Sequence, residues 1–327
     1  MPPILVHIIY TPGTVTKLLP FAKRLVAHSS ARFALVTNGS SPEEVEQLHS
    51  YASSLPDRIR LIDLHTNEML EHGDIVEQLL DQLPEEESVL AFVDSDIFAS
   101  GPVDLDLLRP RNGEAARCSG LAIWQTPEDQ VAVSGFEIIS GRHLRIDNGV
   151  EVCCTYAAAY DAAVLRRTLT RWNIGLGKYL WDDVPAKVQH HLTSIGARFE
   201  FYDTGKVASL MVQHEGHRVQ YVDIDNFVHI GALSGTRRTD SAPATTARRI
   251  VDFVRSPRDI AKKIAKRVPG TLANRERASI DHLVERRLAA CELVDALAAG
   301  DPNPPVPSWC SDLVLSHLRE LVPPVPS

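Results

Sequence analysis

Two aspartates one residue apart, Asp94 and Asp96, follow an apolar run in LAFVDSDIFAS, residues 90–100. Unpaired carboxylates are costly to bury, and neighbouring ones repel each other. A divalent cation offsets both costs, because Mg²⁺ and Mn²⁺ bind carboxylate oxygens. The alternative is a strand followed by an Asx turn, since Asp and Ser both favour turns. The pair therefore marks either a cation site or a turn, and the elements around it decide between the two.

Strands and helices alternate along the first hundred residues. Apolar runs rich in β-branched residues predict strands at 4–10, 32–39, 58–64 and 88–94. Helical spacing and a Ser-Pro-Glu-Glu start predict helices at 14–28, from residue 41 onward and at 73–83. This alternation predicts a Rossmann-type α/β fold, whose mixed sheet is mostly parallel and flanked by helices. Ligands bind at the carboxyl ends of strands in such sheets, and Asp94 and Asp96 lie at such an end.

Three other phosphate-handling classes match less well. Haloacid-dehalogenase phosphatases carry a D-x-D, but they have Thr or Val where this chain has Phe98, and their motif follows the first strand rather than the fourth. Sugar-1-phosphate nucleotidyltransferases have a Gly-rich signature after strand one, which TPGTVTK (11–17) matches poorly. No G-x-x-x-x-G-K-[ST] occurs, which excludes a P-loop. A metal-dependent phosphatase or nucleotidyltransferase stays open as the competing enzyme class.

Three segments in order resemble GT-A glycosyltransferases, over residues 4–235. DSDIF (94–98) is similar to the D-x-D that ends the fourth strand of that superfamily. Residues 157–203 resemble the second half of family-2-like members: a small-residue run, a basic pair, a Gly-containing loop and an acidic pair. NFVHIGALSG (226–235) resembles their late H-x-G segment, although Leu233-Ser234-Gly235 stands where retaining family-8 enzymes have Lys-Pro-Trp.

The resemblance implies a metal-dependent transfer of sugar from a nucleoside diphosphate (UDP, GDP or dTDP) to an acceptor hydroxyl. It implies that Asp96 binds Mn²⁺ or Mg²⁺ directly, that Asp94 holds the metal or the donor ribose, and that His229 adds a nitrogen ligand. An inverting enzyme also needs a carboxylate as general base. Asp183 is the preferred base and Asp182 the second choice, although Asp-Asp replaces the commoner Glu-Asp. An alternative for this acidic pair is a helix N-terminus, where carboxylates are stabilised.

Further donor contacts are expected from strand ends and Gly-containing segments. Polar residues at the ends of the first two strands stand where GT-A enzymes hold the nucleobase and ribose, and lysines in GLGK and DTGK can reach phosphates. The expected donor-binding residues, with the serine between the two aspartates, are Tyr10, Thr11, Asn38, Asp94, Ser95, Lys178 and Lys206.

Residues 241–327 differ from the rest of the chain. They carry 13 Lys/Arg and 10 Asp/Glu, whereas the first 240 residues have a net charge of −11. SAPATT (241–246) is typical of a linker, and amphipathic helices are expected at 247–268, 275–299 and 309–321. We expect a catalytic domain at 1–240 and a helical extension at 241–327. The extension would serve as a lid, a homodimer contact or a peripheral membrane contact.

Composition narrows the class of protein further. The chain is 44% hydrophobic and 23% charged, as in soluble globular proteins, and an acidic main domain argues against nucleic-acid binding. The N-terminus lacks the features of a signal peptide, and five cysteines show no disulfide or C-x-x-C spacing. We therefore expect a cytoplasmic protein with reduced thiols. A catalytically silent protein that binds nucleotide sugars is the remaining alternative to an enzyme.

Overall fold

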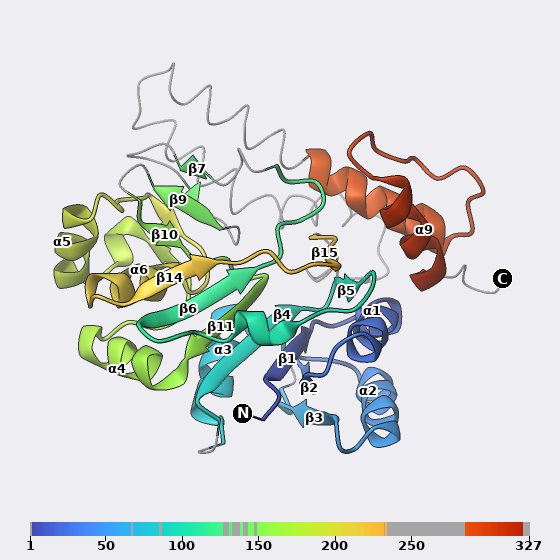
Figure 1. Cartoon of the computed structure of the whole chain (residues 1–327), viewed down its shortest axis with the longest axis horizontal. Helices are drawn as coiled ribbons and strands as arrows, with labels where there is room; N and C mark the ends of the chain where they lie inside the picture. Colours follow the sequence, from blue (N-terminus) through green and yellow to red (C-terminus); the bar gives the residue numbers. More distant parts are fainter. Residues whose placement is uncertain are drawn as a thin grey trace.

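A seven-stranded sheet forms the centre of the computed structural model, which describes residues 2–66, 68–84, 87–126, 131–132, 138–139, 143–146, 149–231, 233 and 285–322 (Figure 1). Its strand order is β14-β6-β11-β4-β1-β2-β3. The strands, in chain order, are β1 (Leu5–Tyr10), β2 (Arg32–Thr37), β3 (Ile59–Asp63), β4 (Val89–Asp94), β6 (Glu114–Ser119), β11 (Ala157–Asp161) and β14 (Arg218–Tyr221).

The sheet is mixed and mostly parallel, which confirms the fold expected from the sequence. β4, β1, β2 and β3 pair in parallel, as do β14 and β6. β11 alone runs against its two neighbours, β4 and β6. The carboxyl ends of β1, β2, β3 and β4 therefore lie at the same edge, and side chains that follow these strands gather there.

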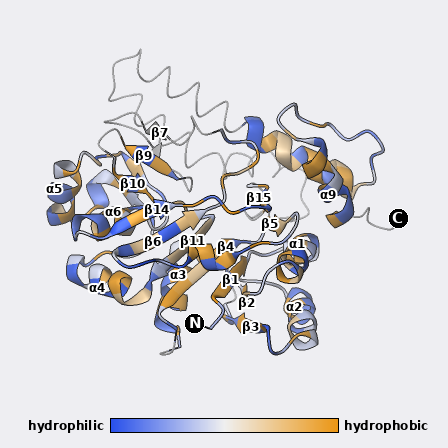
Figure 2. Cartoon of the chain, viewed as in Figure 1, coloured by the Kyte–Doolittle hydropathy of each residue, from blue (hydrophilic) through white to orange (hydrophobic). Residues whose placement is uncertain are grey.

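Helices cover both faces of the sheet. They are α1 (Val15–Ala27), α2 (Pro42–Ser54), α3 (His72–Asp81), α4 (Ala162–Trp172), α5 (Ala186–Ser194), α6 (Lys206–His214) and α9 (Asp312–Leu321). Alternate residues of β1 point to opposite faces: Val6 and Ile8 pack with α1 and α2, and Ile9 packs with α3. The inner strands β1, β2, β4 and β11 are buried on both faces and are mostly hydrophobic, whereas most helices carry one apolar side (Figure 2).

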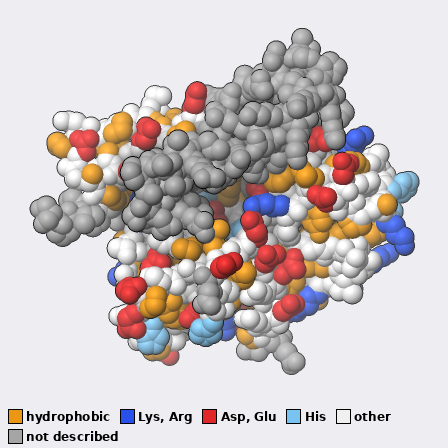
Figure 3. Space-filling view, turned by 180° about the vertical axis from the view of Figure 1, so that it is seen from behind, with side chains coloured by type: hydrophobic (Ala, Val, Ile, Leu, Met, Phe, Trp, Pro, Cys, Tyr) orange, Lys and Arg blue, Asp and Glu red, His pale blue; other side chains and the backbone are white. Residues whose placement is uncertain are grey.

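Short strands and 3₁₀ turns surround the main sheet. Two of these strands, β5 (Ile97–Ala99) and β15 (Phe227–His229), form an antiparallel pair beside the end of β4. The remaining pieces are β7 (Val131–Ala132), β8 (Ile138–Ile139), β9 (Leu144–Ile146), β10 (Glu151–Val152), β12 (Tyr179–Leu180), β13 (Phe201–Tyr202), η1 (Leu105–Leu108) and η3 (Trp181–Asp183). Acidic side chains spread over the face opposite to the view of Figure 1, as expected from the negative charge of this region (Figure 3).

The described C-terminal helices, residues 285–298 and α9, pack onto α1 and β5. Their apolar residues join the same core cluster as Phe21 and Phe98. Lys17 Nζ lies 2.7 Å from an Asp295 carboxylate oxygen, and Arg24 Nη1 lies 2.5 Å from one of Glu320. The expected linker and basic helix, 241–268, lie outside the described residues, so the boundary at 240/241 stays a prediction. In the described part of the chain, no helix has the length and hydrophobicity that a membrane crossing requires.

Two leucines of α9 test how strongly the C-terminal helices are anchored. Leu318 is fully buried, whereas Leu313 is 63% exposed on the same helix. We expect Leu318→Ala to lower the free energy of unfolding by about 2–5 kcal/mol, because it leaves a cavity. Leu313→Ala should change it by no more than about 0.5 kcal/mol. Guanidinium unfolding measures both values. Equal small effects would show that α9 does not contribute to the folded core.

Candidate active site

Asp94, Asp96 and His229 converge at the carboxyl end of β4. Asp94 is the last residue of β4, and Asp96 follows it in the tight turn that leads into β5. β15 pairs antiparallel with β5 so that His229 stands opposite Ile97. Each of the three side chains offers one ligand atom, and these atoms all lie within 4.8 Å of one another. Residues 133 positions apart in the sequence thus form one cluster because of a three-residue strand pairing.

The His229 ring is oriented for ligation. The side chain is fully buried, and its Nδ1 lies 2.7 Å from the Gly120 carbonyl oxygen. A carbonyl only accepts, so Nδ1 carries the hydrogen and the other nitrogen, Nε2, faces the carboxylates. Nε2 lies 3.4 Å from Asp96 Oδ1 and 3.8 Å from Asp94 Oδ2.

The carboxylates decide the charge of that ring. Burial lowers the pKa of His229, but the hydrogen bond and charge of Asp96 and the charge of Asp94 outweigh burial and raise the pKa above its ordinary value. A proton on Nε2 would offset the two negative charges. A divalent cation at the same place would replace that proton, because a histidine ligand must be neutral at the coordinating nitrogen.

Asp96 is fixed in a buried position by the segment that follows His229. Its side chain is fully buried, and Oδ2 accepts a hydrogen bond from the Leu233 backbone N–H at 2.7 Å. The Ile230 N–H donates to the Asp96 backbone carbonyl at 3.1 Å. Asp94 is more open, with 19% of its side chain exposed. The buried carboxylate and imidazole therefore form the floor of the site, and Asp94 stands on its solvent side.

Three neighbours, Gly231, Trp124 and Tyr156, hold this arrangement, and Tyr156 is the one that sequence reasoning missed. Gly231 has φ +72°, and a Cβ there would lie 2.4 Å from the Ala122 Cβ. Trp124 Nε1 donates to the carbonyls of Ile230 and Gly231, at 2.8 and 2.9 Å. The Tyr156 ring packs against His229 with ring centres 4.6 Å apart, and its carbonyl accepts from the Asp94 N–H at 2.7 Å. A glycine two residues after the histidine was the sequence signal for this tight packing.

The strand-end residues expected to bind the donor are mostly buried. Tyr10 and Ser95 have exposures of 0% and 1%, and neither hydroxyl has a hydrogen-bond partner among the described residues. The Thr11 carbonyl accepts from both the N–H and the hydroxyl of Thr14, which closes the turn into α1. Asn38 accepts from the Leu70 N–H at 2.7 Å and donates to the Leu70 carbonyl at 3.0 Å. Asn38 therefore joins two loops at the sheet edge.

The two lysines lie in very different environments. Lys206 was expected to reach phosphates, but its side chain is fully buried and Nζ donates to the Cys153 carbonyl at 2.5 Å. Burial lowers the pKa of Lys206, and the thiols around it oppose that shift. This places Lys206 in the core rather than on a phosphate-binding surface. Lys178 is partly exposed, and its Nζ lies 2.6 Å from Glu71.

The sequence suggested that the acidic pair Asp182-Asp183 opens a helix. In the structure the pair does not open α5. Both side chains are exposed in the 3₁₀ turn η3, and α5 begins three residues later at Ala186, after Pro185. Proline restricts the residue before it to extended backbone, and Val184 (ψ 132°) therefore separates the turn from the helix. The pair is therefore not the N-cap of α5, and its carboxylates are open to solvent.

Comparisons with known proteins give distant similarities to glycosyltransferases. No family model matches the chain. No curated protein matches it either. The apo structure of the bifunctional glycosyltransferase WbbM is 13% identical, with a TM-score of 0.38, and the match covers 67% of this chain but 38% of WbbM. The mannosyltransferase PcManGT from Pyrobaculum calidifontis, in complex with GDP-Man and Mn²⁺, is 15% identical, with a TM-score of 0.42 and coverage of 92% and 77%.

A third solved structure, the galactosyltransferase LgtC with donor and acceptor sugar analogues, is 10% identical. Its TM-score is 0.39, and the match covers 67% of this chain and 73% of LgtC. All three proteins are glycosyltransferases, the class that the sequence motifs resemble. Because the similarity is so distant, the activity has to be inferred from the side chains of this chain.

Two glycines with positive φ test the packing of the cation site. A Cβ at Gly231 would collide with Ala122, whereas Gly216 has φ +89° and nothing within 4 Å of such a Cβ. Both Gly→Ala changes cost about 1 kcal/mol for the left-handed backbone. Only Gly231→Ala should also weaken Mn²⁺ binding, by tenfold or more on the scale of a disturbed outer shell (roughly 10- to 100-fold). Titration calorimetry with Mn²⁺ measures this. Equal affinity in the two variants would contradict a cation site held by the 229–233 segment.

Proposed function

We propose that this protein is a metal-dependent glycosyltransferase that moves a sugar from a nucleoside diphosphate to an acceptor hydroxyl, with inversion at the anomeric carbon. The observation that carries the proposal is the convergence of Asp94, Asp96 and His229 at the carboxyl end of β4. This edge of an open α/β sheet is where ligands bind. The sequence motifs that resemble GT-A enzymes support the same class.

The three side chains have distinct roles in this proposal. Asp96 and His229 Nε2 hold Mn²⁺ or Mg²⁺ from the buried side, and Asp94 holds the cation or the donor ribose from the solvent side. One oxygen-rich set with a single imidazole suits either ion. When bound, the cation stabilises the negative charge that grows on the departing nucleoside diphosphate.

The acceptor hydroxyl must lose a proton as it attacks the anomeric carbon. Asp183 is the proposed base, with Asp182 as the second choice. Both carboxylates are exposed, so an acceptor can approach them from solvent. They lie in η3, before the N-terminus of α5, so neither carboxylate caps that helix.

Asp96→Asn tests the cation site with little change in shape. The amide oxygen can still accept from the Leu233 N–H, but the negative charge is lost. We expect the variant to lose Mn²⁺-dependent binding of UDP, GDP or dTDP, because the cation loses a charged oxygen ligand. Calorimetry with and without Mn²⁺ measures the binding. Asp57→Asn, an exposed aspartate in a turn, is the control.

His229→Ala gives a second readout of the same site. Its effect on diphosphate binding should be much larger with Mn²⁺ than without it. An equal loss under both conditions would assign His229 to packing instead. If diphosphate binding by Asp96→Asn depends on Mn²⁺ as strongly as before, the cation site itself is contradicted. If the unaltered protein binds a nucleotide sugar tightly but does not turn it over, the catalytically silent binder is favoured.

Asp183→Asn tests the base. The change removes the proton acceptor and keeps the volume, so we expect donor and metal binding to persist while turnover falls by roughly 10²- to 10⁴-fold. Asp182→Asn should reduce turnover less. The measurements are steady-state kinetics and NMR of the product, whose anomeric configuration should be opposite to that of the donor. A retained configuration, or full activity in both variants, would contradict the assignment of this pair.

A further inference from the structure

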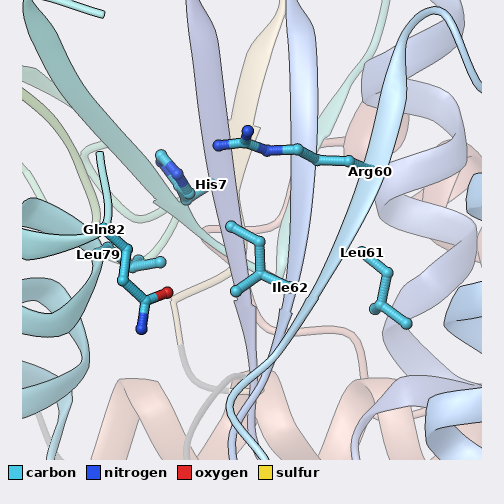
Figure 4. A pocket seen from close by; sticks show the side chains of 6 residues that line it. All are labelled: His7, Arg60, Leu61, Ile62, Leu79 and Gln82. Atoms are coloured by element: carbon cyan, nitrogen blue, oxygen red, sulfur yellow. The ribbon is translucent and has the colours of Figure 1, made fainter. Parts of the chain in front are cut away.

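A pocket of about 260 Å³ lies on the α3 face of the sheet, and it shares no residue with the cation site (Figure 4). Its walls come from β1, β3 and the C-terminal end of α3. The lining residues are His7, Arg60, Leu61, Ile62, Leu79 and Gln82. α3 connects the parallel strands β3 and β4 and so runs back along the sheet. Leu79 and Gln82, at its end, therefore lie over the amino-terminal half of the strands, away from Asp94.

The strand register places two polar side chains of this pocket in one row. His7 of β1 pairs with Ala34 of β2, and Ala34 pairs with Arg60 of β3. Residues in register on parallel strands point to the same face. Because Ala34 between them has only a methyl group, the Arg60 side chain can extend across β2, and Figure 4 shows its guanidinium directed toward the His7 ring.

Arg60 is exposed and brings a positive charge to the mouth of this pocket. Among the residues that the structure describes, Arg60 takes part in no ion pair and no hydrogen bond. The nearby Arg58, by contrast, donates hydrogen bonds to the carbonyls of Ser29 and Ala31. An unpaired guanidinium beside an apolar wall attracts a carboxylate, which it can bind with two parallel hydrogen bonds.

His7 offers the complementary group, a hydrogen-bond acceptor. The ring is 1% exposed, and its Nδ1 donates to the Ala91 carbonyl at 2.8 Å, so Nε2 carries the lone pair. Burial lowers the pKa of His7 to about 4; the hydrogen bond to Ala91 opposes this shift and the Arg60 charge adds to it. The ring is therefore neutral near pH 7 and accepts a hydrogen bond through Nε2.

We propose that this pocket binds a small organic acid that carries a hydroxyl group next to its carboxylate. The carboxylate would pair with Arg60, the hydroxyl would donate to His7 Nε2, and the carbon chain would lie against Leu79 and Ile62. Gln82 is exposed at the rim, where its amide can contact a second polar group. The proposal does not depend on the glycosyl-transfer function, because the two sites have no residue in common.

Malate and succinate are suitable probes, because they differ only in the hydroxyl group. We expect metal-free protein to bind malate more tightly than succinate in titration calorimetry. Arg60→Gln should weaken binding of both acids by tenfold or more, and Arg167→Gln, which alters an exposed arginine of α4, should leave both unchanged. His7→Phe should remove the preference for malate while succinate still binds.

Asp96→Asn separates this pocket from the cation site, since it should lose diphosphate binding and keep malate binding. Circular dichroism checks that each variant is folded, and Arg60→Lys provides a second test that keeps the charge but not the paired hydrogen bonds. The proposal is overturned if neither acid binds the unaltered protein at roughly 10 mM. It is equally overturned if Arg60→Gln binds both acids as the unaltered protein does, because Arg60 would then only complement the negative end of the α3 dipole.

Discussion

Burial of the Asp96 carboxylate is the constraint on which this structure depends. A charge without solvent contact is tolerated only with partners, and Asp96 has the Leu233 N–H on one oxygen and His229 Nε2 near the other. Both partners come from a segment more than 130 residues away. The short β5–β15 pairing, the glycine at 231 and the indole of Trp124 all serve to keep that segment against the end of β4. They bring a third ligand, His229, to a sheet edge where the end of β4 and the turn after it supply two aspartates.

The two-sided burial of the sheet gives this edge its rigidity. β4 is enclosed between β1 and β11 and covered on both faces, so Asp94 cannot shift without disturbing two packed layers. The C-terminal helices extend one of these layers over β5, where His317 packs on Phe98 with ring centres 5.9 Å apart. β5, the strand that follows the two aspartates, is thus supported by packing against α9. In this way residues at the end of the chain contribute to the position of Asp96.

The periodicity of the sequence predicted the strands β1 to β4 and the helices between them, because each of these depends on local patterns that repeat every two or 3.6 residues. The cluster of Asp94, Asp96 and His229 was predicted only through a resemblance, since nothing local relates residue 229 to residue 96. Lys206 and Asn38 have contacts that such reasoning could not foresee. Each is polar and follows a Gly or a strand, but distant backbone carbonyls and amides, from Cys153 and Leu70, occupy their side chains. The expectation that the acidic pair at 182–183 opens a helix was wrong for a local reason, because α5 begins only after Pro185.

The same sheet also explains how two sites of opposite charge coexist a short distance apart. Each strand exposes alternate residues to the α3 face, and His7 stands two residues before Ile9, which pairs with Asp94. Moving along one strand by two residues therefore leads from a region with an unpaired guanidinium to one with two carboxylates. The side chains between them, Ile9, Val36 and Ile62, are apolar and offer no charged group that would link the two sites. A carboxylate at any of these three positions would pair with Arg60 and weaken its attraction for an anion. If Arg60 reached Asp94, it would in the same way weaken the attraction of the cation site for a cation. Apolar residues in that row keep the two kinds of ligand apart.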